Sequence, residues 1–228
     1  LRVGADAGDG EIAVKAIGDI KKRKMKAFYS AMKAYILTPD ELAEEGKKLE
    51  AAGLDEFTIM DSAGTMLSDE VAAYTEKLYR AVTIPVAFHG HNNLGMSAAN
   101  AVAAWENGAS ILDCGLMGMA RSAGNLATEM CVALMRRRGQ MEDIDFYGML
   151  DFIDQRLQPA MEQYKYHNPV PPLDLVLGYS GCHSSFVKQF KAAAAEKNVS
   201  LYRLISEVSE INKKNPKPEL IAEIAESL

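Results

Sequence analysis

The first 140 residues alternate regularly between short apolar segments and longer segments with helical periodicity. Successive apolar segments begin roughly 25 to 30 residues apart, the spacing that a strand, a crossover helix and a return to a parallel strand require. The expected strands are Leu1–Ala5, Ala27–Ala31, Glu56–Met60, Ile84–Phe88 and Ser110–Cys114. This alternation predicts five consecutive βα units and a parallel sheet, which is either open and doubly wound or closed as a barrel.

The residues that follow the expected strands favour the barrel. Small and polar residues follow every one of them, as in Asp61-Ser62-Ala63-Gly64 and His89-Gly90-His91-Asn92-Asn93. Polar ends on all strands are typical of a barrel, in which every strand contributes to one rim. A doubly wound sheet usually concentrates its site at one switch point. We therefore expect an α/β fold of the TIM (β/α)8 class, of which this sequence contains the last five βα units.

The pattern changes after Gly139, where longer helical stretches and a Pro-rich loop replace the strands. The expected helices are Asp145–Gln163, Cys182–Lys197, Leu201–Asn212 and Pro218–Leu228. We predict two domains: a partial TIM-barrel catalytic domain over residues 1–140 and a C-terminal helical domain over residues 141–228.

Composition excludes several classes of partner. The net charge is -6 and the pI about 5.3, and an acidic chain without a basic stripe argues against nucleic acid. No apolar run approaches the roughly 20 residues that span a bilayer, so no membrane partner is expected. The three cysteines lie far apart and form no disulfide framework, which favours a cytoplasmic location. One of them, Cys114, is expected to pack in the core.

The pair His89 and His91 is the first candidate for chemistry. Residues i and i+2 of a strand face the same side, with Cα atoms about 6.5 to 7 Å apart. Two imidazoles at this spacing suit one divalent cation such as Zn, Mn, Fe or Co. The alternative is that both histidines pack in the core. Two ligands do not complete a metal site, so at least one carboxylate must come from elsewhere.

Two further segments have both a structural and a functional interpretation. Asp61 closes the third strand, where it is either a helix cap or, with Ser62 and backbone amides, a group that orients a substrate carboxylate. Gly124–Glu129 is expected to open a helix whose free N–H groups favour an anionic ligand, with Arg121 nearby. Asn125 would then be either an N-cap or a site residue.

The sequence FHGHNNLGMSAANAVAAWENGASILDCGLMGMARSAGN resembles the metal-dependent TIM-barrel aldolase/lyase superfamily. This superfamily includes 4-hydroxy-2-oxovalerate aldolase, 3-hydroxy-3-methylglutaryl-CoA lyase and the isopropylmalate synthases. The aldolase branch is the most similar, because the resemblance extends through Asp61-Ser62-Ala63-Gly64 and through Leu177–Phe186 in the helical region. It covers nearly the whole chain.

The resemblance implies roles for particular residues. The two metal-binding histidines of the family correspond to His89 and His91, and the serine that contacts the substrate carboxylate corresponds to Ser62. The asparagine that the lyase branch uses near the metal corresponds to Asn125. The implied cofactor is a divalent cation, with Mn²⁺ expected and Mg²⁺, Co²⁺ or Zn²⁺ as alternatives. Where the aldolases have a catalytic tyrosine, this chain has His183, which either moves a proton near neutral pH or marks a different substrate.

The function implied by the resemblance is metal-dependent cleavage of a 4-hydroxy-2-oxo acid to pyruvate and an aldehyde. The alternatives are an acyl-CoA lyase or synthase and a degenerate, non-catalytic barrel that acts as a binding module. The family's Arg, metal-binding Asp and His base of the first strand have no counterpart here, so the sequence is expected to be a fragment. An acylating aldehyde dehydrogenase that takes up the aldehyde and a second copy of the chain are the expected protein partners.

Overall fold

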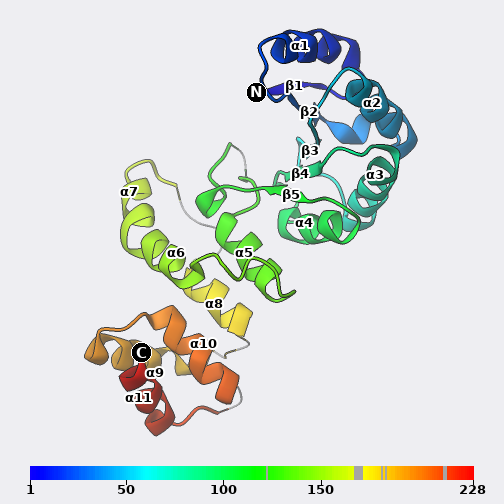
Figure 1. Cartoon of the computed structure of the whole chain (residues 1–228). Helices are drawn as coiled ribbons and strands as arrows, with labels where there is room; N and C mark the ends of the chain where they lie inside the picture. The colour runs from blue at the N-terminus through cyan, green and yellow to red at the C-terminus, as the bar shows by residue number, and fades with distance from the viewer. Residues whose placement is uncertain (122, 167–171, 181, 183, 213–214) are drawn as a thin grey trace. The chain divides into compact units, whose positions relative to one another are not determined.

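The chain folds into two compact units, Leu1–Cys131 and Val132–Leu228 (Figure 1). The computed structural model describes residues 1–121, 123–166, 172–180, 182, 184–212 and 215–228. The division falls before the predicted one at residue 140, because Val132 and Ala133 are buried in the core of the second unit.

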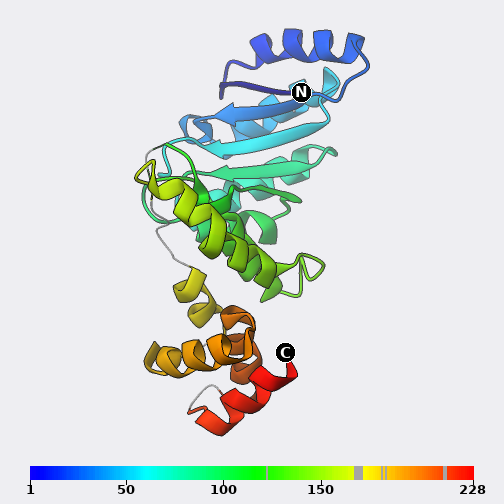
Figure 2. The same ribbon diagram turned by 90° about the vertical axis from the view of Figure 1, so that its left-hand side faces the viewer.

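The first unit contains the predicted parallel sheet. Its five strands are paired in chain order, β1 (Arg2–Asp6), β2 (Phe28–Met32), β3 (Glu56–Asp61), β4 (Val86–Gly90) and β5 (Ile111–Asp113). Figure 2 shows this uninterrupted order. A doubly wound sheet reverses its order at a switch point, whereas a barrel wall continues in one direction. The order therefore confirms the barrel class over the open sheet.

Helices cover one face of this sheet (Figure 1). They are α1 (Gly10–Lys22), α2 (Pro39–Ala51), α3 (Ser68–Ala81) and α4 (Ser97–Glu106), with 3-10 turns η1 (Ala34–Ile36) and η2 (Leu116–Gly118). The start of α2 is fixed by its sequence: Thr38 and Glu41 form a capping box in front of Pro39. The strands contribute fully buried side chains on the helix side, including Tyr29, Phe57 and Phe88.

The opposite face of the sheet carries charged side chains among apolar ones and is strongly curved. Alternation along the strands places Arg2, Glu56 and His89 on this face. The Arg2 guanidinium forms ion pairs with Glu56 on β3 and with Asp113 on β5. The edges of a flat five-stranded sheet would be about 19 Å apart, beyond the reach of one arginine side chain. The sheet must therefore bend around this face, as the wall of a barrel does.

The second unit is helical, as predicted. It begins within α5 (Thr128–Arg136). The elements after α5 are α6 (Phe146–Phe152), the π-turn η3 (Ile153–Leu157), α7 (Gln158–Glu162), α8 (Pro172–Ser180), the 3-10 turn η4 (Ser184–Phe186), α9 (Val187–Lys197), α10 (Leu201–Ile211) and α11 (Pro218–Ser227). Its core includes Phe146, Leu150, Phe190 and Leu204. Helix α8 was not predicted, and the helix expected from Cys182 begins only at Val187. Among the described residues, no helix has both the length and the apolar character needed to cross a membrane.

Candidate active site

The carboxyl end of β4 brings the two histidines together as predicted. His89 lies on β4 and His91 directly follows it, and their ring centroids are 5.3 Å apart at an interplanar angle of 60°. The side chain of His89 is 19% exposed. His91 is buried, at 8% exposure. Both rings thus lie on the same side of the strand, at the carboxyl end of the sheet, as the i, i+2 spacing requires.

Two polar side chains contact opposite nitrogens of the His89 ring. Nδ1 lies 3.3 Å from Oδ2 of Asp113 on the neighbouring strand, because the register pairs these two residues. Nε2 lies 3.4 Å from Nδ2 of Asn125. The sequence predictions missed Asp113, although a carboxylate at the end of a rim strand is a visible signal.

The segment around Asn125 differs from the predicted helix start. Helix α5 begins at Thr128, so Asn125 is not its N-cap. The backbone just before α5 instead pairs with the end of β4. Asn125 forms a β-bridge with His91, and the Leu126 N–H donates to the Gly90 carbonyl at 3.1 Å. This pairing turns the Asn125 side chain toward the histidines.

Asp61 is placed by the loop that follows β3. Its side chain is fully buried, and its two carboxylate oxygens accept backbone N–H bonds from Thr65 and Met66, each at 3.0 Å. These bonds favour the structural interpretation, in which Asp61 holds the loop in shape. Gly64 in this loop has φ +60, and a Cβ there would lie 2.5 Å from the backbone nitrogen of Asn93. The loop therefore packs directly on the segment that carries His91.

Ser62 lies at the same edge and is half-buried. Its Oγ accepts a bond from the Lys33 backbone N–H at 2.8 Å. Since that bond uses an acceptor site, the Ser62 hydroxyl hydrogen is available to donate to another group. The Lys33 side chain is paired with Asp6 at 2.7 Å.

The surroundings of His91 favour its neutral form. Burial lowers the pKa of His91 below its usual value, and the neighbouring His89 and Arg121 lower it further, whereas Asp61 opposes them. A neutral imidazole is the form that binds metal ions. Catalytic His183 was predicted from the resemblance, and it lies outside the described residues.

The site fits part of a metal coordination sphere. Oδ1 of Asn125 is buried and has no hydrogen-bond partner among the described residues, and such an acceptor beside two imidazoles suits a cation. No group of three or more His, Cys, Asp or Glu side chains that could hold a metal occurs among the described residues. The three candidate ligands are therefore His89, His91 and Asn125, and they do not fill the sphere on their own.

Cys114 was expected in the core, but it is exposed just after β5. Cys131, near the start of α5, and Thr128 form hydrogen bonds to its sulfur, because Gly115 is bridged to Ala127. These bonds lower the pKa of Cys114 to about 6, against the opposing effect of burial.

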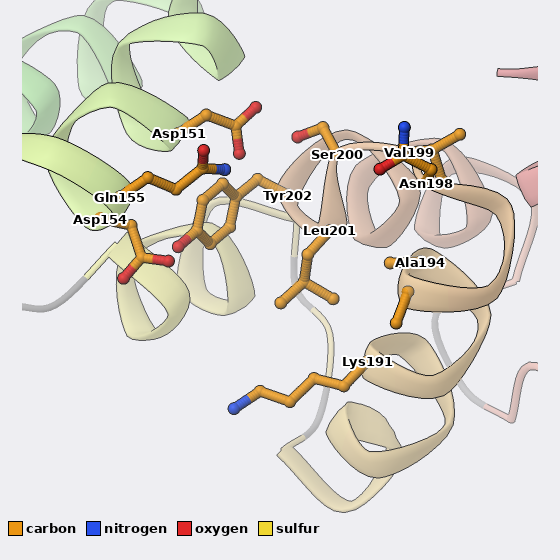
Figure 3. Close-up of a pocket in the computed structure, with 11 residues that line it drawn as sticks. Asp151, Asp154, Gln155, Lys191, Ala194, Asn198, Val199, Ser200, Leu201 and Tyr202 are labelled. Atoms are coloured by element: carbon orange, nitrogen blue, oxygen red, sulfur yellow. The ribbon is translucent and has the colours of Figure 1, made fainter.

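The second unit contains a separate hollow of about 400 Å³ between α6, η3, α9 and α10 (Figure 3). Its wall includes Asp151, Asp154, Lys191, Ser200 and Tyr202. Tyr202 forms a hydrogen bond with Asp154, and Ser200 forms one with Asp151. Burial raises the pKa of Asp151 above its usual value.

A curved sheet of successive parallel βα units, with polar side chains gathered at the strands' carboxyl ends, defines the class of α/β-barrel proteins. The family described as HMGL-like matches residues 10–155. The chain belongs to this family.

Similar proteins agree with that assignment. The chain is 33% identical to a 4-hydroxy-2-oxovalerate aldolase from Moorella thermoacetica over 228 residues, covering all of this chain and 67% of that protein. It is 33% identical to one from Chloroflexus aurantiacus over 209 residues, covering 91% of this chain and 60% of that protein. It is 34% identical to one from Pectobacterium atrosepticum over 232 residues, covering all of this chain and 66% of that protein. The chain thus spans about two thirds or less of these relatives' length.

Solved structures show the shared fold. The hydroxymethylglutaryl-CoA lyase from Pseudomonas aeruginosa matches with a TM-score of 0.64 at 17% identity, over 78% of this chain and 67% of that one. The carboxyl transferase domain of Rhizobium etli pyruvate carboxylase matches with a TM-score of 0.65 at 14% identity, over all of this chain and 42% of that one.

Proposed function

We propose that this chain forms part of a divalent-metal-dependent aldolase that cleaves a 4-hydroxy-2-oxo acid to pyruvate and an aldehyde. The observation that carries the proposal is the convergence of His89, His91 and the unpaired buried Oδ1 of Asn125 at the sheet edge. The names of the similar aldolases supply the reaction class.

His89, His91 and Asn125 would hold the cation, with Mn²⁺ the first expectation and Mg²⁺, Co²⁺ or Zn²⁺ as alternatives. A bound divalent cation supplies the positive charge that stabilises the negative charge left on the 2-oxo acid when the carbon–carbon bond breaks. At least one further ligand, a carboxylate or a water molecule, would be needed to complete the coordination. The low pKa of His91 keeps its lone pair available for binding.

Ser62 would orient the substrate. Its hydroxyl hydrogen, left free by the bond from Lys33, donates to the substrate carboxylate. Asp61 acts indirectly, because its bonds to Thr65 and Met66 fix the loop that begins with Ser62.

The proton and electron movements follow from the reaction class. A base removes the proton from the 4-hydroxyl, the bond between C3 and C4 breaks, and the oxygen on C4 becomes the aldehyde carbonyl. The electron pair of the broken bond stays on the three-carbon fragment, which takes up a proton at C3 to become pyruvate. We propose His183 as a group that moves one of these protons.

The test compares two substrate classes on the full-length protein supplied with Mn²⁺. Release of pyruvate from 4-hydroxy-2-oxopentanoate supports the aldolase, and turnover of 3-hydroxy-3-methylglutaryl-CoA in its place supports the acyl-CoA alternative. Inactivity on both substrates, together with no divalent metal in the purified protein, would identify a non-catalytic barrel.

We also propose a protein partner and a location. A reactive aldehyde product favours an acylating aldehyde dehydrogenase that consumes it. Among the described residues, β1 and β5 are the outer strands of the sheet, and exposed outer strands favour association with a second copy of the chain. Pull-down of the full-length protein with such a dehydrogenase tests the dehydrogenase partner, and the mass of the protein in solution tests association with a second copy. A cytoplasmic location stays a prediction.

A further inference from the structure

The His89 ring is contacted at both nitrogens by groups of fixed hydrogen-bonding character. An ionised carboxylate only accepts, so the contact between Asp113 and Nδ1 requires a proton on Nδ1. The Asn125 Nδ2 group only donates, so its contact with Nε2 requires a lone pair there. Both contacts select the same tautomer, in which Nδ1 carries the proton.

Asp113 is itself held in place by an ion pair. Arg2 donates to the same carboxylate oxygen that contacts His89, and its other terminal nitrogen donates to Glu56 at 2.8 Å. The carboxylate oxygen that faces His89 is therefore also the acceptor of an ion pair with the Arg2 guanidinium. Glu56 is further anchored by Thr58, whose Oγ1 donates to it at 3.4 Å. The acceptor facing His89 is thus a carboxylate fixed by a network on the face of the sheet opposite the helices.

We propose that Asp113, braced by Arg2, is a positioning residue that fixes the tautomer and ring orientation of His89, so that the Nε2 lone pair faces Asn125. The tautomer follows from the contacts alone, whereas its use in binding a cation rests on the proposed function. A carboxylate behind a ligating histidine fixes the ring and increases its basicity. Asp113 has this effect without touching the cation or the substrate.

The decisive measurement needs no metal. Two-bond nitrogen–proton correlation spectra of the ¹⁵N-labelled, metal-free protein distinguish the imidazole tautomers at about pH 8, where imidazole side chains are neutral. His89 of the unmodified protein is expected to show the Nδ1–H pattern. Asp113→Ala removes the only carboxylate acceptor in contact with Nδ1 among the described residues, and should raise the Nε2–H population. Asp19→Ala, which removes an exposed carboxylate paired with Lys22, should leave the pattern unchanged.

The proposal is overturned if His89 already shows the Nε2–H pattern in the unmodified protein, a result that requires no variant to fold. It is equally overturned if a folded Asp113→Ala protein keeps the unmodified pattern. His91, whose acidic neighbour is Asp61, serves as the internal reference in each spectrum.

A second measurement links positioning to binding. Titration with Mn²⁺ alone should show an affinity about 10- to 100-fold lower in Asp113→Ala than in the unmodified protein, the usual effect of losing a group behind a ligand. An unchanged affinity overturns the role in binding. Failure of the unmodified full-length protein to bind any divalent cation would overturn the proposed function instead, while the tautomer spectra still decide the positioning.

Discussion

Each of the two units contains a cluster of polar side chains, and the two clusters differ in what their polar groups contact. At the carboxyl end of the sheet in the first unit, strand register brings together side chains from separate βα units, and the buried Oδ1 of Asn125 has no partner in the part of the chain that the structure describes. In the hollow of the second unit, Tyr202 is bonded to Asp154 and Ser200 to Asp151. Ser200 also caps α10 by accepting a bond from Arg203 N–H.

A hollow lined by polar groups therefore does not by itself define a reactive site. In the second unit, Ser200 caps a helix, and the bonds of Ser200 and Tyr202 connect neighbouring helices, so the hydrogen-bonding capacity of these groups is used within the fold. The sheet edge instead leaves capacity free beside two imidazoles, which is the condition for binding a ligand. Three experiments test this contrast.

The largest effect is expected from removing a candidate ligand. His89→Ala and His91→Ala should each reduce metal-dependent pyruvate release by more than about 100-fold. Loss of a residue that only orients a metal ligand already reduces activity by up to about 100-fold, and loss of the ligand itself should have a larger effect. The matched change in the second unit is Lys191→Ala, on the wall of its hollow, which should retain activity. Steady-state rates with Mn²⁺ measure all three. The contrast fails if Lys191→Ala loses as much activity as the histidine variants.

A smaller effect is expected from Gly64→Ala. The new Cβ would meet backbone atoms of Asn93 and His91 at 2.5 and 2.8 Å, and φ is +60, so the change should cost at least about 1–3 kcal/mol of the free energy of unfolding. The control is Gly18→Ala, in helix α1, where nothing lies within 4 Å and a gain of about 0.5–1 kcal/mol is expected. Urea unfolding measures both. Equal stability of the two variants would show that the loop does not pack tightly on the His91 segment.

The smallest effect concerns thiol reactivity. Because the pKa of Cys114 is lowered to about 6, its reactive thiolate forms as the pH rises through that value. At pH 7 its thiolate fraction is about 30-fold above that of a free cysteine of pKa ~8.5. Burial raises the pKa of Cys182 in the second unit. Mass spectrometry after brief iodoacetamide treatment should therefore find Cys114 modified first, with a midpoint near pH 6. Faster modification of Cys182 would contradict this order.

Much of the first unit was predictable because its signals are local. Apolar segments at regular spacing gave all five strands, and the i, i+2 spacing placed His89 and His91 side by side. The capping box of Thr38 and Glu41 was likewise readable from four consecutive residues. The second unit was less predictable. Helix α8 follows a Pro-rich stretch, and its buried side chains pack in a core formed with helices distant in the sequence.

The sequence by itself determined the succession of βα units, the class of fold and the pair of imidazoles, because strand periodicity and helix capping act between near neighbours. Only the tertiary structure decided the surroundings of His89. Asp113 is 24 residues away and Asn125 is 36 away, and Arg2 reaches Asp113 across 111 residues of chain. Their contacts depend on the register and curvature of the sheet, which arise only when every strand has packed against its helices.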